Sequence, residues 1–185
     1  MTRAGDTNQT MTDAPGKILL VIGGARSGKS SFALEKAGTF SGRKAYIATA
    51  QPLDDEMKER IEQHKAQRGK EWDTFEEPIE MARVLKGIGR GYGACVIDCL
   101  TLWLSNLLIG SEKLEEEIES FLAFLKSGRF PTLFIVSNEV GMGIVPDNAL
   151  SRKFRDLAGN LNQKVAAIAD EVYLVTAGIP LLIKQ

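Results

Sequence analysis

Residues 23 to 30 read GGARSGKS, a composition suited to binding phosphate. Gly23, four residues, and then Gly28, Lys29 and Ser30 make the complete P-loop pattern. Glycines let the backbone curl so that N–H groups point at phosphate oxygens, and a helix start adds partial positive charge. We expect Lys29 to act as the catalytic cation on the β- and γ-phosphates and Ser30 to ligate Mg²⁺. The expected nucleotide contacts in this loop are Gly23, Gly24, Ala25, Arg26, Ser27, Gly28, Lys29 and Ser30.

An acidic group is also needed to hold the metal ion of a P-loop site. Asp98 ends the apolar run ACVID at residues 94 to 98, and an aspartate at the end of a buried strand can reach Mg²⁺ as Walker-B residues do. The alternative is an ordinary helix cap before Leu100, because aspartate is a favoured capping residue.

His64 is the only histidine in the chain. Arg60, His64 and Arg68 are four residues apart, so on a helix they share one face. Two guanidinium groups could hold phosphates while the neutral imidazole acts as a nucleophile. The alternative is a solvated histidine on a polar helix.

The elements that must position these residues alternate between strands and helices. Apolar runs predict strands at 17–22, 44–49, 72–75, 94–98, 132–137 and 171–176, and periodicity predicts helices at 29–37, 54–68, 78–86, 100–109, 112–126 and 147–169. This order predicts an α/β fold with a mostly parallel sheet flanked by helices, in the P-loop NTPase (RecA-like) class.

Composition limits the function classes. The 185 residues suit one domain over 16–185 behind a flexible, polar tail at 1–15, which lacks the apolar core of a signal peptide. A net charge of −1 gives no general attraction to nucleic acid or anionic membranes, and no run approaches the ~20 apolar residues of a membrane span. Cys95 and Cys99 lie in or beside an apolar run, so we expect no disulfide and a reducing cytoplasm.

Several blocks of this sequence carry a resemblance to a known family. They include GGARSGKSSFALEKA, YIATAQPLDDEMKERIEQHKAQR, WDTFEEP, VIDCLTLWLSNLL and NEVGMGIVP followed by FRDLAGNLNQ, in this order along nearly the whole chain after the tail. The sequence resembles the bifunctional adenosylcobinamide kinase / adenosylcobinamide-phosphate guanylyltransferase family. The first block is common to P-loop enzymes, whereas the second and the last are much more specific.

The resemblance implies two reactions on a corrinoid substrate. A hydroxyl of adenosylcobinamide takes the γ-phosphoryl group of ATP or GTP, and the resulting phosphate then receives GMP from GTP with release of pyrophosphate. In this family GMP is carried on a histidine, whose position falls on His64; the neighbouring histidine of some members is Gln63 here. The resemblance also implies a homotrimer.

The resemblance also extends the expected site to other residues. Thr49, Ala50 and Gln51 end a predicted strand and are expected to contact the nucleotide, as are Arg68, Glu76 and Asp98. Glu76 could instead be a solvated charge, and the segment NEVGMG at 138–143 could shape a substrate pocket or simply form a tight turn. Met57, Ile61, Trp103 and Leu104 are expected in the core or a subunit contact.

Two rival functions keep the P-loop. One is a kinase for another small alcohol, which has no use for His64. The other is a nucleotide-dependent switch that recruits a partner without covalent chemistry. The NKxD motif that gives small GTPases their guanine specificity is absent from the sequence.

Overall fold

The computed structural model describes residues 16–66, 68–89, 91–128 and 130–185. The predicted N-terminal tail, 1–15, lies outside the described residues. The elements in chain order are β1 (Ile18–Gly23), α1 (Lys29–Gly38), β2 (Lys44–Ala48), α2 (Asp55–Ala66), β3 (Trp72–Glu76), α3 (Met81–Ile88), β4 (Ala94–Asp98), α4 (Leu100–Gly110), α5 (Leu114–Lys126), β5 (Thr132–Asn138), α6 (Ala149–Ile168), β6 (Glu171–Thr176) and β7 (Ile179–Lys184).

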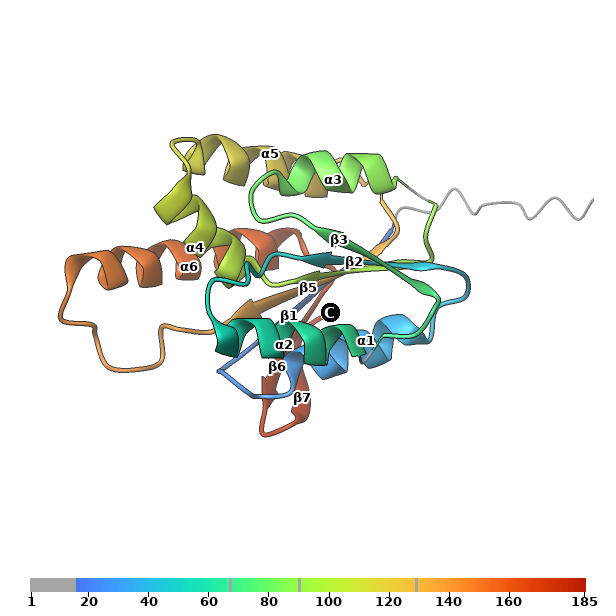
Figure 1. The fold of residues 1–185 in the computed structure, drawn as a ribbon, viewed down its shortest axis with the longest axis horizontal. Helices are drawn as coiled ribbons and strands as arrows, with labels where there is room; N and C mark the ends of the chain where they lie inside the picture. The colour runs from blue at the N-terminus through green and yellow to red at the C-terminus, as the bar shows by residue number, and fades with distance from the viewer. Residues whose placement is uncertain (1–15, 67, 90, 129) are drawn as a thin grey trace, which may run out of the picture.

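A seven-stranded sheet organises the described residues, with the order β3-β2-β4-β5-β1-β6-β7 (Figure 1). All neighbouring pairs are parallel except β6 with β7. Parallel pairing requires crossover connections, and helices supply them on both faces. The predicted P-loop α/β fold with a mostly parallel sheet is therefore confirmed.

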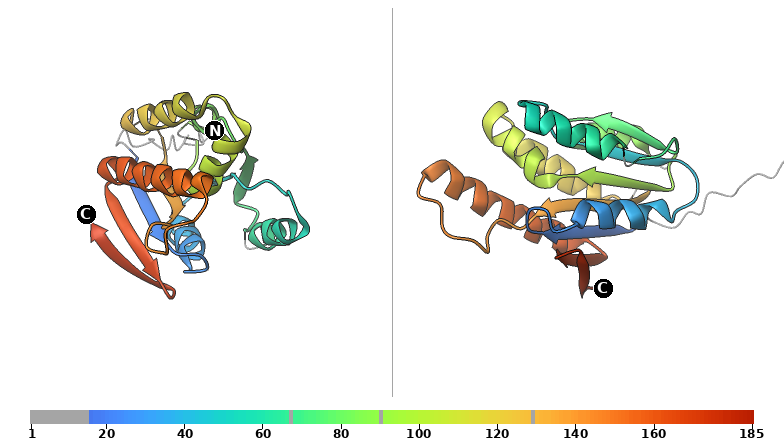
Figure 2. Two further views of the ribbon diagram at one scale, coloured as in Figure 1. Left: turned by 90° about the vertical axis from the view of Figure 1, so that its left-hand side faces the viewer. Right: turned by 60° about the horizontal axis from the view of Figure 1, so that its bottom comes forward.

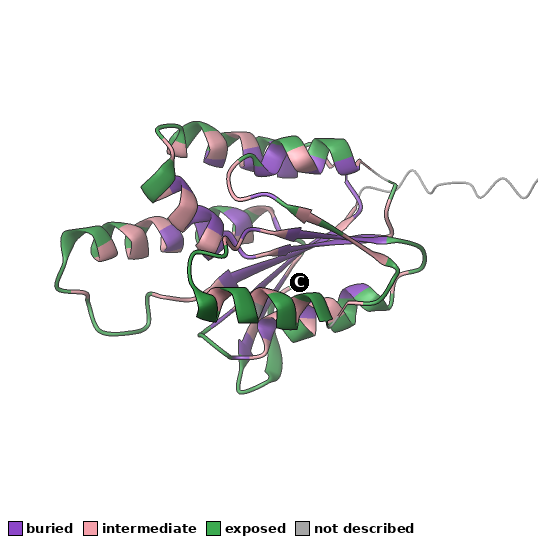
Figure 3. Cartoon of the chain, in the orientation of Figure 1, coloured by how far each residue is buried: buried purple, intermediate pink, exposed green. Residues whose placement is uncertain are grey.

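Helices cover the sheet in two layers (Figures 1 and 2). On one face α3, α4, α5 and α6 bury a large core that takes in Ile18 and Leu20 of β1. On the other face α1 packs through Ala33 and Ala37 against Leu19 and Val21. Alternate residues of β1 thus enter different cores, which explains why the central strands read as continuous apolar runs (Figure 3).

Helix α2 lies on the same side of the sheet as α1 but has a different character (Figure 2). Most of its described residues are exposed, and its first turn carries Asp55 and Glu56, which suit the positive end of a helix (Figure 3). It ends at Ala66, so the prediction that it runs to residue 68 was wrong.

Two other boundaries differ from the predictions for local reasons. Helix α3 begins at Met81 and not at Pro78, because the Glu77 carboxylate accepts hydrogen bonds from the N–H groups of Ile79 and Glu80 and holds this segment as a turn. Helix α6 begins at Ala149, where the Asn148 side chain accepts a hydrogen bond from the N–H of Ser151 at 2.8 Å.

Strand β7 was missed by the sequence analysis. It contains Pro180, which lacks an N–H donor and is tolerated at the edge of a sheet. The hairpin turn before it has Ala177 and Gly178 at φ 51° and 79°, the positive values that a type I′ turn requires. An alanine is an unusual residue there, so the sequence carried no strong hairpin signal.

Lys184 at the end of β7 secures the C-terminal end of α6. Its Nζ donates hydrogen bonds to the carbonyl oxygens of Ala166, Ala167 and Ala169, at 2.7, 3.1 and 2.7 Å. Carbonyls at a helix C-terminus lack partners within the helix and carry partial negative charge, so an ammonium group stabilises them.

We expect Lys184→Met to lower the free energy of unfolding by about 1.5–3 kcal/mol, because charged hydrogen bonds to the end of α6 are lost. Lys164→Met removes an exposed lysine from the same helix and is expected to cost less than about 0.5 kcal/mol. Urea unfolding followed by circular dichroism measures both variants. Equal losses would show that the effect is one of net charge.

Candidate functional site

The P-loop connects β1 to α1 at the edge of the sheet where the parallel strands end. Gly28 has φ 93°, a left-handed conformation that glycine adopts without strain, and it occupies the N-cap of α1 without a side-chain cap. The first N–H groups of α1 therefore face the loop, as an anion site requires. Nζ of Lys29 donates to the Gly24 carbonyl at 2.9 Å, so the lysine bends back over the loop.

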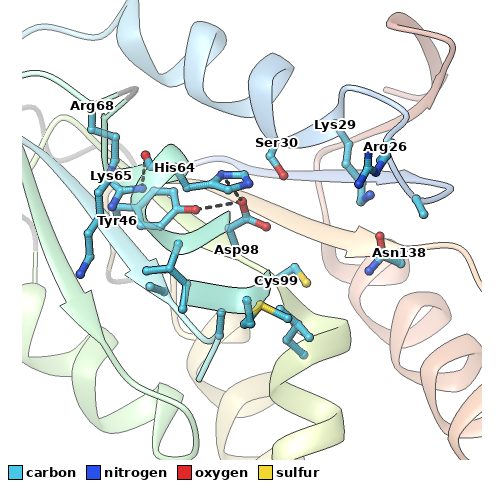
Figure 4. A pocket seen from close by; sticks show the side chains of 16 residues that line it. Arg26, Lys29, Ser30, Tyr46, His64, Lys65, Arg68, Asp98, Cys99 and Asn138 are labelled. Atoms are coloured by element: carbon cyan, nitrogen blue, oxygen red, sulfur yellow. Dashed lines mark hydrogen bonds and ion pairs between the residues drawn. The ribbon is translucent and has the colours of Figure 1, made fainter. Parts of the chain in front are cut away.

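Two adjoining cavities open beside the P-loop, and Figure 4 shows the side chains that line one of them. One of about 360 Å³ lies over the loop itself, and the other, of about 290 Å³, extends toward β2, β4 and α2. Four side chains line both cavities: Arg26, Lys29, Ser30 and His64. The structure thus brings the predicted nucleophile and the predicted phosphate-binding residues to one place.

The second cavity combines charged and apolar walls. It is lined by Ala25, Arg26, Lys29, Ser30, Tyr46, Ala48, Ala50, Met57, Ile61, His64, Lys65, Arg68, Asp98, Cys99, Leu102 and Asn138. Met57 and Ile61 were expected in the core or a subunit contact, but they line this cavity at helical spacing with His64. Trp103 and Leu104 are fully buried in the core, as expected.

Asp98 ends β4 with its carboxylate among the residues that line the cavity (Figure 4). Helix α4 begins at Leu100 with Cys99 at its N-cap, so Asp98 does not occupy the capping position of the alternative interpretation. The side chain is only 12% exposed. Its Oδ2 accepts a hydrogen bond from the Tyr46 hydroxyl at 2.9 Å and lies 3.9 Å from Nδ1 of His64.

Tyr46 is a site residue that the sequence analysis missed. It lies on β2, two residues before the strand end, and is nearly fully buried. Burial, and then the negative charge of Asp98, raise the pKa of the Tyr46 hydroxyl well above its usual value, so it remains a donor. A buried tyrosine usually finds a partner for its hydroxyl, and a tyrosine in an apolar strand was the available signal.

His64 and Arg68 are neighbours in an arrangement that differs from the predicted helical face. Because α2 ends at Ala66, Arg68 lies beyond the helix; its Nη1 donates to the His64 carbonyl at 2.7 Å. Its guanidinium carbon lies 3.9 Å from the centroid of the Tyr46 ring, a cation–π contact. The side chain of Arg60 lies outside the described residues.

The predicted nucleotide contacts after β2 differ in whether they line a cavity. Ala50 lines the second cavity, whereas Gln51 lines neither. Thr49 is fully buried: its hydroxyl donates to the Cys99 carbonyl and accepts from the Cys99 N–H, both at 2.8 Å. This reciprocal bond holds the chain after β2 against the end of β4.

Two acidic segments near the site have local partners. Glu76 is mostly exposed and forms an ion pair at 3.0 Å with Lys65, which lines the second cavity. Glu139 accepts a hydrogen bond from the Gly141 N–H, which favours the tight-turn interpretation of residues 138–143. Asn138 lines the second cavity.

Cys95 and Cys99 are buried free thiols, and burial raises the pKa of both.

The donor atoms beside the P-loop fit Mg²⁺. The Ser30 hydroxyl and the Asp98 carboxylate line the same cavity and supply hard oxygen ligands. Within the described ranges, no group of three or more His, Cys, Asp or Glu side chains converges on a metal position. Two protein oxygen ligands are compatible with Mg²⁺, which keeps several waters and binds substrate phosphates together with one or two protein groups.

The two glycines that open the P-loop differ in the space around them. A Cβ on Gly23 would lie 2.4 Å from the Val175 carbonyl oxygen and 2.6 Å from Oγ of Ser27, whereas one on Gly24 would meet nothing within 4 Å. We therefore expect Gly23→Ala to lower the free energy of unfolding by about 1–3 kcal/mol through overpacking. Gly24→Ala is expected to leave it unchanged or raise it by up to about 1 kcal/mol.

Urea unfolding and calorimetric titration with GTP check this pair. Gly23→Ala is expected to weaken GTP binding by about tenfold or more, as a distortion worth ~1.4 kcal/mol would. Equal behaviour of the two variants would contradict the steric explanation.

Comparisons with known proteins identify the family. The profile of the family described as cobinamide kinase / cobinamide phosphate guanyltransferase matches residues 19–183. The bifunctional adenosylcobalamin biosynthesis protein CobP of Pseudomonas aeruginosa is 42% identical over 168 residues, covering 89% of this chain and 96% of that protein. The bifunctional adenosylcobalamin biosynthesis proteins CobU of Escherichia coli and Salmonella typhimurium are 40% and 41% identical, covering 90% of this chain and 99% of each relative.

Solved structures show a more distant similarity. The RadB recombinase gives a TM-score of 0.49 with 17% identity, covering 87% of this chain and 74% of that chain. The KaiC-like protein of Pyrococcus horikoshii OT3 gives 0.44 with 15% identity, covering 86% and 72%. The family assignment depends on the sequence relatives, which match nearly from end to end: the chain belongs to the cobinamide kinase / cobinamide phosphate guanyltransferase family.

Proposed function

We propose that this chain phosphorylates adenosylcobinamide with ATP or GTP and then transfers GMP from GTP to the phosphate through a guanylyl group on His64. The observation that carries the proposal is that the only histidine of the chain lines both cavities beside the P-loop. A covalent carrier must reach the α-phosphate of the nucleotide, and His64 lies beside the loop that would hold that nucleotide. Family membership supports both activities.

The P-loop side of the site suits a nucleoside triphosphate. The N–H groups at the start of α1 and the Lys29 ammonium would hold the phosphates. Ser30 and Asp98 would hold Mg²⁺, which when bound offsets the negative charge of the phosphates. In the kinase reaction the hydroxyl oxygen of the acceptor attacks the γ-phosphorus, and Lys29 and Arg26 stabilise the charge that spreads over the phosphoryl oxygens.

Guanylyl transfer divides into two in-line steps. An imidazole nitrogen of His64 forms a bond to the α-phosphorus of GTP while the bond to pyrophosphate breaks. The phosphate of the corrinoid substrate then attacks the same phosphorus, and the imidazole leaves with its electron pair. Two displacements of this kind replace one difficult transfer, and the cations of the P-loop stabilise the leaving pyrophosphate.

Other nucleotide contacts are part of the same proposal. Ala50 and Arg68 line the second cavity, so a guanosine moiety there would contact them. Glu76 would act through its ion pair with Lys65. Thr49 and Gln51 would act by shaping the chain after β2.

The two rival functions make no use of the histidine. A kinase for another alcohol and a nucleotide-dependent switch both need the P-loop and Mg²⁺, but neither explains why His64 lines both cavities. GTP labelled in the α-phosphate separates the three, because only the guanylyltransferase retains the label covalently.

We expect incubation with GTP and Mg²⁺ to add one GMP to the wild-type chain and none to His64→Ala, because no other histidine can carry it. Intact-protein mass spectrometry measures the adduct, and EDTA added before GTP should prevent it. Calorimetric titration of His64→Ala with GTP provides the control for nucleotide binding. A wild type that binds GTP without forming an adduct would leave the kinase or the switch as the better account.

The proposal includes a homotrimer, and β7 offers a surface for it. Ile179, Leu181 and Ile183 are 70%, 59% and 53% exposed, and their strand is at the edge of the sheet (Figure 3). An apolar edge strand favours association unless it is covered, and another copy of the chain would cover it.

None of the described helices is long and apolar enough to cross a membrane. With its net charge of −1, the chain is proposed to act in the cytoplasm without nucleic-acid partners.

We expect Leu181→Glu to convert a trimer into monomers, because a carboxylate placed in an apolar contact must be desolvated. Light scattering after size-exclusion chromatography measures the mass. Ile109→Glu, at a 76% exposed position on α4, is the matched control and should remain trimeric. A monomeric wild type, or a trimeric Leu181→Glu, would contradict this assignment.

A further inference from the structure

The imidazole of His64 has one nitrogen whose environment is not explained by phosphate binding. Nδ1 is buried and has no hydrogen-bond partner. A buried polar atom without a partner costs about 1–3 kcal/mol, so such an atom usually has a partner in the working state of a site. The facing anionic group is Oδ2 of Asp98, 3.9 Å away, which is about 1 Å too far for a hydrogen bond.

Tyr46 holds this Asp98 oxygen in place. Its hydroxyl donates to the same Oδ2 at 2.9 Å, and its strand pairs in register with β4, where Ala48 lies opposite Asp98. Strand backbone and burial leave the tyrosine ring little freedom. Both contacts use Oδ2, so Oδ1 takes part in neither.

Arg68 connects the same tyrosine to the histidine from the other direction. Its guanidinium group stacks on the Tyr46 ring and donates a hydrogen bond to the His64 carbonyl oxygen. Tyr46 therefore contacts both the carboxylate that faces Nδ1 and the arginine that holds the histidine backbone (Figure 4). Polar contacts of this kind fix the ring orientation and the tautomer of a histidine.

We propose that Tyr46 and Asp98 are a positioning pair for His64: Oδ2 of Asp98, held by the Tyr46 hydroxyl, accepts the Nδ1–H, and Nε2 is thereby the nitrogen that attacks phosphorus. The inference rests on the proposed guanylyl transfer and adds which nitrogen reacts and what selects it. The inference requires the imidazole to move from its present 3.9 Å separation to hydrogen-bond distance of Oδ2 when the site is at work.

The reaction step balances with this assignment. The lone pair of Nε2 forms the N–P bond, and the bond from the α-phosphorus to the bridging oxygen breaks, so that the electron pair leaves on pyrophosphate. The proton stays on Nδ1, and the positive charge of the guanylylated imidazole lies next to the Asp98 carboxylate. When the acceptor phosphate displaces the histidine, the electron pair of the N–P bond returns to Nε2 and the neutral tautomer is restored.

The single histidine makes a direct test possible. We would label the imidazole nitrogens of the full chain with ¹⁵N and record long-range ¹H–¹⁵N spectra at alkaline pH. Wild type is expected to show a proton on Nδ1 and a bare Nε2, and after GTP treatment a ³¹P coupling on Nε2. Tyr46→Phe, which keeps the ring under Arg68, is expected to shift the tautomer toward Nε2–H.

Kinetics of adduct formation give a second readout. Tyr46→Phe is expected to slow the appearance of the GMP adduct by about 10–100-fold, the usual effect of removing a group that orients a reactive histidine. Tyr173→Phe is the matched control: it removes a hydroxyl that donates to a carboxylate, Glu171, at 2.7 Å, but Tyr173 lines neither cavity. The control should leave both the tautomer and the rate unchanged.

The outcomes separate this inference from the function on which it rests. An adduct through Nδ1, a wild type with its proton on Nε2, or a Tyr46→Phe variant with unchanged tautomer would overturn the positioning pair while leaving guanylyl transfer intact. No adduct in the wild type would overturn the proposed function and this inference together. Thermal unfolding of Tyr46→Phe within a few degrees of wild type shows that a slower rate does not reflect loss of the fold.

Discussion

The in-register parallel pairing of β4 with its neighbours is the constraint on which the site depends. It places Asp98 opposite Ala48 of β2 and opposite Val136 of β5, so that these residues lie toward the carboxyl ends of their parallel strands. Since β1 pairs with β5 in parallel, the P-loop leaves the sheet at the same ends. The reciprocal hydrogen bond between Thr49 and Cys99 then holds the β2 and β4 ends together. A slip of this pairing by one residue would turn Asp98 to the opposite face.

Much of this arrangement could be predicted because the signals are local. The P-loop is a continuous motif whose backbone does the binding, and the buried parallel strands need unbroken apolar runs. These two patterns located β1, β4 and β5, and with them Lys29 and Asp98. The importance of His64 came from the resemblance to a family, since a histidine on a polar helix carries little information alone.

The parts that were missed or misplaced depend on contacts between distant segments. Tyr46 gains its role only when β2 lies beside β4, and Arg68 acts through a ring 22 residues away in sequence. Met57 and Ile61 were expected in the core or a subunit contact, but together with His64 they line the second cavity. Strand β7 depends on a turn with Ala177 at positive φ. Alanine does not favour this conformation by itself, so it is the pairing of β7 with β6 that holds the turn.

The β6–β7 hairpin also supports the P-loop. The N–H of Gly178 donates to the Ser27 carbonyl at 2.8 Å. Gly178 also lies close to Gly28, because a Cβ added to Gly28 would be 3.2 Å from the Cα of Gly178. β1 itself pairs with β6. During synthesis on the ribosome, the P-loop sequence therefore emerges well before β6 and the hairpin turn that support it. A nascent chain that has not yet reached β6 and β7 would carry the motif without these contacts, so we expect the loop to take its native shape only after that hairpin has formed.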